Sequence, residues 1–130
     1  VNNYVTNIPD WMLSADLLIT KAGGLILSEG LAAGLPIVLI NNLPGQEEGN
    51  VRYILENNAG ILASTPAELI PILNSWLSNG QSNLNTIKDN SRRIGHPSAA
   101  LSVAESLWQA SSSSAVSEPF TQPEIVGYLE

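Results

Sequence analysis

Apolar and polar positions alternate along the chain in the manner of an α/β protein. The apolar runs at 17–20 and 36–40 are short and unbroken, as in parallel strands that are buried on both faces. A shorter run at 61–63 predicts a further strand, and 4–6 predicts the end of an earlier one. Apolar residues at helical spacing predict helices over about 7–15, 24–33, 46–58, from 66 onward, 82–94 and 97–110.

Residues with known positional preferences mark where these helices start and stop. Thr65 and Glu68 form a capping box with Pro66 at the first helical position. Gly34 followed by Pro36 ends the second helix. The helix after Pro66 is expected to bury Leu69, Ile70, Leu73, Trp76 and Leu77, and the last helix Leu101, Ala104, Leu107 and Trp108.

The order of strands and helices predicts a parallel sheet, in which a helix connects each strand to the next. These crossover connections are expected to be right-handed. This order is typical of the second half of a doubly wound domain. We therefore expect the first strands, and the part of the protein before them, to be missing from this chain. Residues 1–110 are assigned to a partial domain, and the acidic, serine- and proline-containing segment 111–130 to a disordered tail.

Composition and charge exclude several classes of function. The apolar content of 44% predicts a packed core, and a net charge of −7 argues against binding the phosphate backbone of a nucleic acid. The chain has no Cys and one His, so we expect no disulfide, no metal centre and no cofactor. No apolar run is long enough to span a membrane and no signal peptide opens the chain, which favours a cytoplasmic location.

The turn after the strand at 17–20 contains Gly23 and Gly24 and opens a helix. The first backbone N–H groups of a helix have no partner within it and lie at its positive end, so they attract anions. Glycine lets a diphosphate approach these N–H groups closely. Leu25 provides the next N–H group of the helix, and Lys21 can add a positive charge. The competing interpretation is an ordinary strand-to-helix turn with a solvated lysine.

Polar side chains follow at the same edge of the predicted sheet. Glu29 can accept hydrogen bonds from two adjacent ribose hydroxyls, although a solvent-facing glutamate is equally ordinary on a helix. Gln46, Glu47 and Asn50 begin the helix after the next strand, and an amide with a carboxylate can bind several sugar hydroxyls. Here the competing interpretation is an acidic first turn favoured by the helix dipole.

These features together resemble the C-terminal UDP-sugar-binding domain of the family 28 glycosyltransferases. The motif D-L-L-I-T-K-x-G-G-x-x-x-x-E starts at Asp16, G-L-P follows, and P-G-Q-E-x-x-N ends at Asn50. The resemblance covers roughly residues 4–108. It is strongest to the glycolipid-making branch, which comprises monogalactosyldiacylglycerol synthases and bacterial diacylglycerol glucosyltransferases.

The resemblance implies the C-terminal half of a GT-B enzyme, a Rossmann-like domain that holds the UDP-sugar donor. Matched by position, the backbone at Val5 and Thr6 would face the uracil, and Glu29 the ribose hydroxyls. The other implied contacts are to the diphosphate, from Lys21, Gly23, Gly24 and Leu25, and to the hexose, from Gln46, Glu47 and, following the same motif, Asn50.

The reaction implied is transfer of a hexose from UDP to the hydroxyl of diacylglycerol, with inversion of configuration. In this family the acceptor site, the membrane-docking surface and the catalytic base belong to an N-terminal domain, which we expect this chain to lack. No catalytic residue is therefore assigned here, and the chain alone is expected to be inactive. In the complete enzyme it would lie peripherally on the membrane.

Three other interpretations are open at this stage. A UDP-N-acetylglucosamine 2-epimerase shares the nucleotide-binding half, but the Pro-Gly-Gln-Glu loop argues against it. The chain is otherwise a donor-binding subunit of a split glycosyltransferase, or a remnant whose exposed first strand promotes aggregation. Glucose and galactose donors are not distinguished, since Gln46 and Glu47 are compatible with both.

Overall fold

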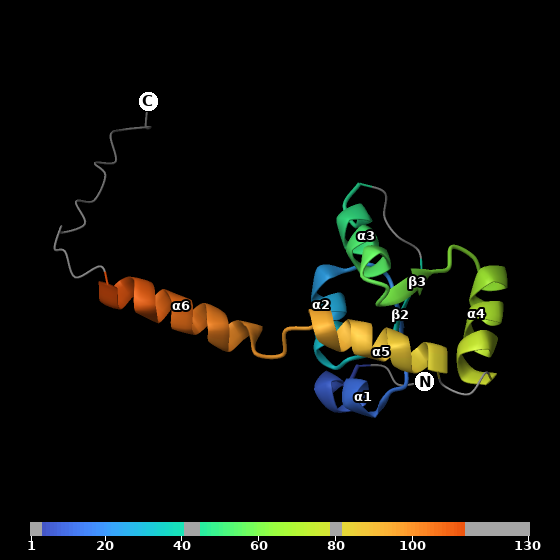
Figure 1. Cartoon of the computed structure of the whole chain (residues 1–130), viewed down its shortest axis with the longest axis horizontal. Helices are drawn as coiled ribbons and strands as arrows, with labels where there is room; N and C mark the ends of the chain where they lie inside the picture. The colour runs from blue at the N-terminus through green and yellow to red at the C-terminus, as the bar shows by residue number, and fades with distance from the viewer. Residues whose placement is uncertain (1–3, 41–44, 79–81, 114–130) are drawn as a thin grey trace. The chain divides into compact units, whose positions relative to one another are not determined.

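The computed structural model describes residues 4–40, 45–78 and 82–113, and within them the predicted α/β class is confirmed (Figure 1). The strands form one parallel sheet in the order β1-β2-β3. In chain order the elements are α1 (Ile8–Ser14), β1 (Leu18–Thr20), α2 (Gly24–Ala32), β2 (Ile37–Leu39), α3 (Glu48–Glu56), β3 (Gly60–Leu62), α4 (Pro66–Ser78), α5 (Ser82–Ile94) and α6 (Ala99–Ser113).

The strand predicted to end at 4–6 is wrong for these three residues. They have no strand conformation, and the side chain of Tyr4 is 87% exposed. A strand forms only where a neighbouring strand pairs its backbone, and three alternating side chains do not identify such a neighbour. The sheet of the described residues therefore starts at β1.

The central strand β2 forms the middle of the core. Ile37, Val38 and Leu39 are each fully buried, because helices cover both faces of the sheet. Ile37 and Leu39 pack in one cluster with Leu27 and Leu31 of α2, Val51 and Ile54 of α3, and Ile94 of α5. Val38 lies on the other face, in a cluster with Trp76 of α4 and Leu84 of α5.

Helix α5 joins these two layers, running from α4 at its start to α2 at its end (Figure 1). Its polar side chains donate hydrogen bonds to the carbonyl groups of residues 57–59, just before β3. Asn90 donates to the carbonyl of Asn58 at 3.1 Å, the fully buried Ser91 to that of Ala59 at 3.3 Å, and Arg93 to that of Asn57 at 3.4 Å. The bond from Ser91 satisfies a carbonyl at the fully buried Ala59, which would otherwise lack a partner at a cost in free energy.

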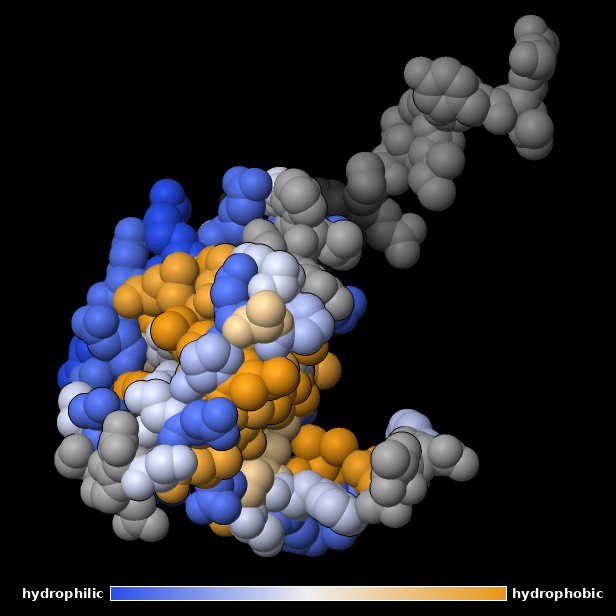
Figure 2. Space-filling model, turned by 90° about the vertical axis from the view of Figure 1, so that its right-hand side faces the viewer, coloured by the Kyte–Doolittle hydropathy of each residue, from blue (hydrophilic) through white to orange (hydrophobic). Residues whose placement is uncertain are grey.

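Helix α4 starts as predicted but buries less than predicted. The hydroxyl of Thr65 accepts a hydrogen bond from the N–H of Glu68 at 3.3 Å. The Glu68 carboxylate accepts one from the N–H of Ser64 at 2.9 Å. Ile70 and Leu77, however, are each 60% exposed. Figure 2, which shows the side of the molecule that carries α4, has hydrophobic residues gathered on its surface. The apolar stripe of α4 is wider than the sheet surface that it covers.

Helix α6 belongs to a second compact unit, which comprises residues 98–130. Leu101, Leu107 and Trp108 are exposed within this unit, so the prediction that they face a core is not confirmed there. The helix extends to Ser113, past the boundary predicted at 110. The assignment of the remaining tail lies outside the described residues from 114 onward, and the domain boundary stays a prediction.

We predict that Ile37→Ala lowers the free energy of unfolding by about 2–5 kcal/mol, because it leaves a cavity in the fully buried central strand. Ile70→Ala removes the same atoms from an exposed position and should change that free energy by less than about 0.5 kcal/mol. Urea unfolding followed by circular dichroism measures both. Equal losses in the two variants would contradict the placement of the core.

Candidate functional site

The pairing register of β1 and β2 determines where the candidate site lies. Leu18 pairs with Ile37 and Thr20 with Leu39, so the two strands end level with each other. Because both strands run in the same direction, the chain leaves them at one edge of the sheet. Helices α2 and α3 both begin at this edge, as in α/β proteins that bind ligands at the carboxyl ends of their strands.

The first turn of α2 offers free backbone donors. Gly23 precedes the helix and gives it no side-chain cap. The first helical hydrogen bond is donated by Leu27 to the carbonyl of Gly23 at 3.1 Å. The N–H groups of Gly24, Leu25 and Ile26 come before that bond and have no acceptor within the helix. Together with the positive end of the helix dipole they suit an anionic group such as a diphosphate.

The fold itself does not require glycine at these two positions. Gly23 has φ −70°, which any residue adopts, and Gly24 is not among the residues with positive φ. A Cβ added at Gly23 would meet nothing nearer than the Ile26 side chain at 3.7 Å, and one at Gly24 nothing nearer than Asn50 at 3.8 Å. Two consecutive glycines without a backbone reason favour a ligand that approaches closely.

Lys21 is the basic residue nearest in sequence to these donors. It is exposed and makes no ion pair within the described residues. The other four basic side chains have partners: Arg52 with Glu56 at 3.9 Å, Lys88 with Asp16 at 3.9 Å, Arg92 with Asp89 at 3.2 Å, and Arg93 with the carbonyl of Asn57 at 3.4 Å. Lys21 therefore has a charge available for a ligand.

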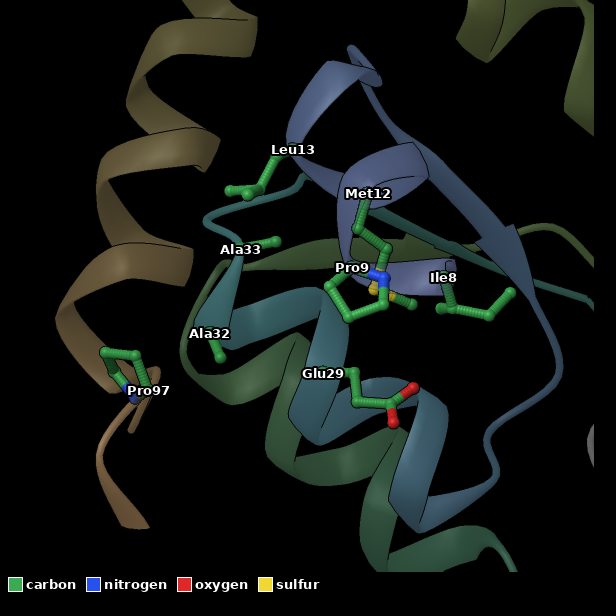
Figure 3. Close-up of a pocket in the computed structure, with 8 residues that line it drawn as sticks. All are labelled: Ile8, Pro9, Met12, Leu13, Glu29, Ala32, Ala33 and Pro97. Atoms are coloured by element: carbon green, nitrogen blue, oxygen red, sulfur yellow. The ribbon is translucent and has the colours of Figure 1, made fainter. Parts of the chain in front are cut away.

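Glu29 projects from α2 beside an apolar groove of about 310 Å³. Its carboxylate is directed toward the N-terminal end of α2, with Ile8 and Pro9 of α1 lying across from it (Figure 3). The carboxylate is therefore directed toward the end of α2 at which the free N–H groups lie. Met12, Leu13, Ala32, Ala33 and Pro97 complete the lining. Sequence reasoning missed the contribution of α1, because apolar residues on a short helix look like ordinary core.

The residues at the start of α3 differ in their surroundings. Gln46 is exposed, whereas Glu47 is 6% exposed and has a bonding partner of its own. Asn50, in the first turn of α3, donates from Nδ2 to the carbonyl oxygen of Ala22 at 2.8 Å. This bond brings the start of α3 against the turn that carries Gly23 and Gly24, as the sequence predicts. Roles of Gln46 and Glu47 in sugar binding stay predictions.

The residues predicted to face a base come shortly before α1 in the chain. Val5 is half-buried and Thr6 exposed, and both directly precede α1, whose Ile8 lines the groove beside Glu29. Within the described residues, no three His, Cys, Asp or Glu side chains are placed to hold a metal ion. In the same residues no helix combines the length and the apolar character needed to cross a membrane.

Comparison with known proteins identifies the family. The model of the glycosyltransferase family 28 C-terminal domain matches residues 1–105. The chain belongs to this family. It is therefore a Rossmann-like half of a GT-B fold, as the sequence motifs implied.

Curated relatives of this chain include monogalactosyldiacylglycerol synthases. Monogalactosyldiacylglycerol synthases 3 and 2 of Arabidopsis thaliana, both named chloroplastic, are each 36% identical over 107 residues, which are 82% of this chain and 23% of each relative. A probable monogalactosyldiacylglycerol synthase 3 of Oryza sativa is 31% identical over 111 residues, 85% of this chain and 22% of the relative. The chain thus spans less than a quarter of these relatives' length.

We predict that Gly24→Ala leaves the stability of this family 28 domain unchanged or raises it by up to about 1 kcal/mol, because alanine favours a helix and the added methyl group meets no close neighbour. Gly60→Ala is the contrast, since its Cβ would collide with the carbonyl of Ile37. It should cost about 2 kcal/mol or more. Thermal unfolding of both variants measures this. A destabilised Gly24→Ala would show that the fold does require the glycine.

Proposed function

We propose that this chain is the donor-binding part of a glycosyltransferase that moves a hexose from UDP to a diacylglycerol-type lipid, with inversion at the sugar. The observation that supports it most is the meeting of α2 and α3 at one edge of the sheet. There an uncapped glycine turn lies against the first turn of α3, joined to it by the hydrogen bond from Asn50 to Ala22. The family membership and the lipid glycosyltransferases among its relatives support the same proposal.

Each part of the donor would meet a different element. The diphosphate would accept hydrogen bonds from the N–H groups of Gly24 and Leu25, with Lys21 close in sequence. Glu29 would accept the ribose hydroxyls, and the backbone at Val5 and Thr6 would bind the uracil at the end of the groove that Ile8 lines. The hexose would lie toward Gln46 and Glu47 at the start of α3. Helix dipole and amides would then stabilise the negative charge of the departing diphosphate.

The acceptor lipid and the membrane enter this proposal through the rest of the enzyme. We assign the acceptor site and the catalytic base to an N-terminal domain or a separate subunit, and the complete enzyme to the membrane surface. The names of the relatives, monogalactosyldiacylglycerol synthases, support diacylglycerol as the acceptor. By itself the chain should bind the donor and transfer nothing. Hexose transfer to diacylglycerol vesicles by the purified chain would contradict this division of roles.

We predict that UDP causes saturable shifts in the amide spectrum of the chain, and that Glu29→Gln weakens this binding about tenfold or more. The amide of glutamine keeps the size of the side chain but loses the charge that strengthens two hydrogen bonds to the ribose. Glu105→Gln, on exposed α6, is the matched control and should bind UDP like the parent chain. Equal affinity in parent and Glu29→Gln would remove Glu29 from the site.

We predict that Gly24→Ala, although stable, binds UDP about tenfold or more weakly, because the methyl group blocks the approach of phosphate oxygens to the first N–H groups of α2. The same titration measures the affinity. Uridine, which lacks the diphosphate, is the control ligand and should bind parent and variant equally. A stable variant with unchanged affinity for UDP would place the diphosphate elsewhere.

A further inference from the structure

The peptide group between Ala22 and Gly23 is fixed at both of its ends. Its N–H, on Gly23, donates to the carbonyl of Lys21 at 2.8 Å, which closes a tight turn around Ala22. Its carbonyl, on Ala22, accepts the Nδ2 hydrogen of Asn50 at 2.8 Å. Ala22 itself is fully buried. The plane of this peptide therefore depends on a side chain that comes 28 residues later.

That peptide directly precedes the donors of α2. Gly23 provides both the N–H that closes the turn and the carbonyl that accepts the first helical hydrogen bond, from Leu27 at 3.1 Å. Rotation of the Ala22–Gly23 peptide would therefore change the direction in which the following N–H groups point. Gly23 and Gly24 have no side chains to resist such a rotation, because glycine adopts many backbone conformations at little cost.

We propose that Asn50 is a positioning residue, which orients the glycine turn for the diphosphate through Ala22 rather than by binding the hexose. This inference rests on the proposed function, since it names how the same site is assembled. A backbone carbonyl only accepts hydrogen bonds, so the nitrogen of the Asn50 amide must face Ala22. The amide keeps a second N–H and its Oδ1 oxygen, but the N–H that holds Ala22 cannot serve a sugar hydroxyl without releasing the glycine turn.

The same bond joins the two parts of the donor site. Asn50 lies in the first turn of α3, three residues after Glu47, whereas Ala22 lies two residues before the start of α2 at Gly24. One side-chain amide thus holds the segment proposed for the hexose against the segment proposed for the diphosphate. Loss of the amide should affect every ligand that carries the diphosphate, whether or not it carries a sugar.

The test compares Asn50→Ala and Asn50→Asp with the parent chain. Alanine removes the donor, and aspartate keeps the shape but presents a carboxylate that only accepts hydrogen bonds. Each variant should bind UDP, UDP-glucose and UDP-galactose about tenfold more weakly than the parent chain, with the same factor for all three ligands. In the unliganded variants the carbonyl ¹³C resonance of Ala22 should shift, and the amides of Gly23 and Gly24 should show exchange broadening. Asn90→Ala is the matched control, because it also breaks a long-range bond from an amide to a carbonyl.

Each result decides the role of Asn50. Unchanged UDP binding with weakened UDP-hexose binding would overturn the inference and make Asn50 a direct hexose ligand. An equal loss of UDP binding in Asn90→Ala would also overturn it, because general destabilisation would then explain the effect. If the parent chain binds no UDP, the proposed function fails. The positioning role is then judged from the resonances of Ala22, Gly23 and Gly24 alone, and unchanged resonances would refute it.

Discussion

The parallel pairing of β1 with β2 is the constraint on which the candidate site depends. Parallel strands deliver their following helices to one edge of the sheet, and the level register of Thr20 with Leu39 brings the starts of α2 and α3 together. Complete burial of β2 under helices on both faces maintains that register, since a shift by one residue would exchange the two faces. The bond from Asn50 to Ala22 is possible only because this arrangement is fixed first.

Much of this arrangement could be predicted from the sequence, for a physical reason. Strands buried on both faces must be short, unbroken apolar runs, and the chain must turn sharply into each helix, where glycine is favoured. Helix α5 occupies the predicted residues 82–94, and β1 and β2 lie inside the predicted runs. The capping box at Thr65 and Glu68 predicted the start of α4 because its hydrogen bonds are local.

The sequence predicted which residues form helices and strands better than it predicted which surfaces these elements pack against. Ile70 and Leu77 occupy the apolar side of α4 at helical spacing, yet the sheet covers only part of that side. Hydrophobic periodicity shows which residues are apolar but not how much surface a neighbouring element offers. The groove beside Glu29 and the acceptor role of Ala22 were missed for a related reason. Both depend on backbone and apolar groups that carry no distinctive residue type.

The glycine turn shows what a structure adds to a motif. Gly34 has φ +71°, so the backbone alone explains why glycine ends α2. Gly23 and Gly24 have no such requirement, and a methyl group would fit at either position. The sequence contains all three glycines without distinguishing these cases. Only the backbone angles and the surrounding space separate a glycine that the fold needs from one that the fold does not need.

The charge of the chain makes the geometry of this turn more important. A chain with net charge −7 repels a diphosphate at long range, and four of its five basic side chains already have partners. In the proposed donor site, attraction would then come at short range, from Lys21 and from the N–H groups at the start of α2. Hydrogen bonds depend steeply on direction, more than the attraction between charges does. A donor site in such an acidic chain therefore depends on the orientation of a few peptide groups, and an amide such as that of Asn50 can control it.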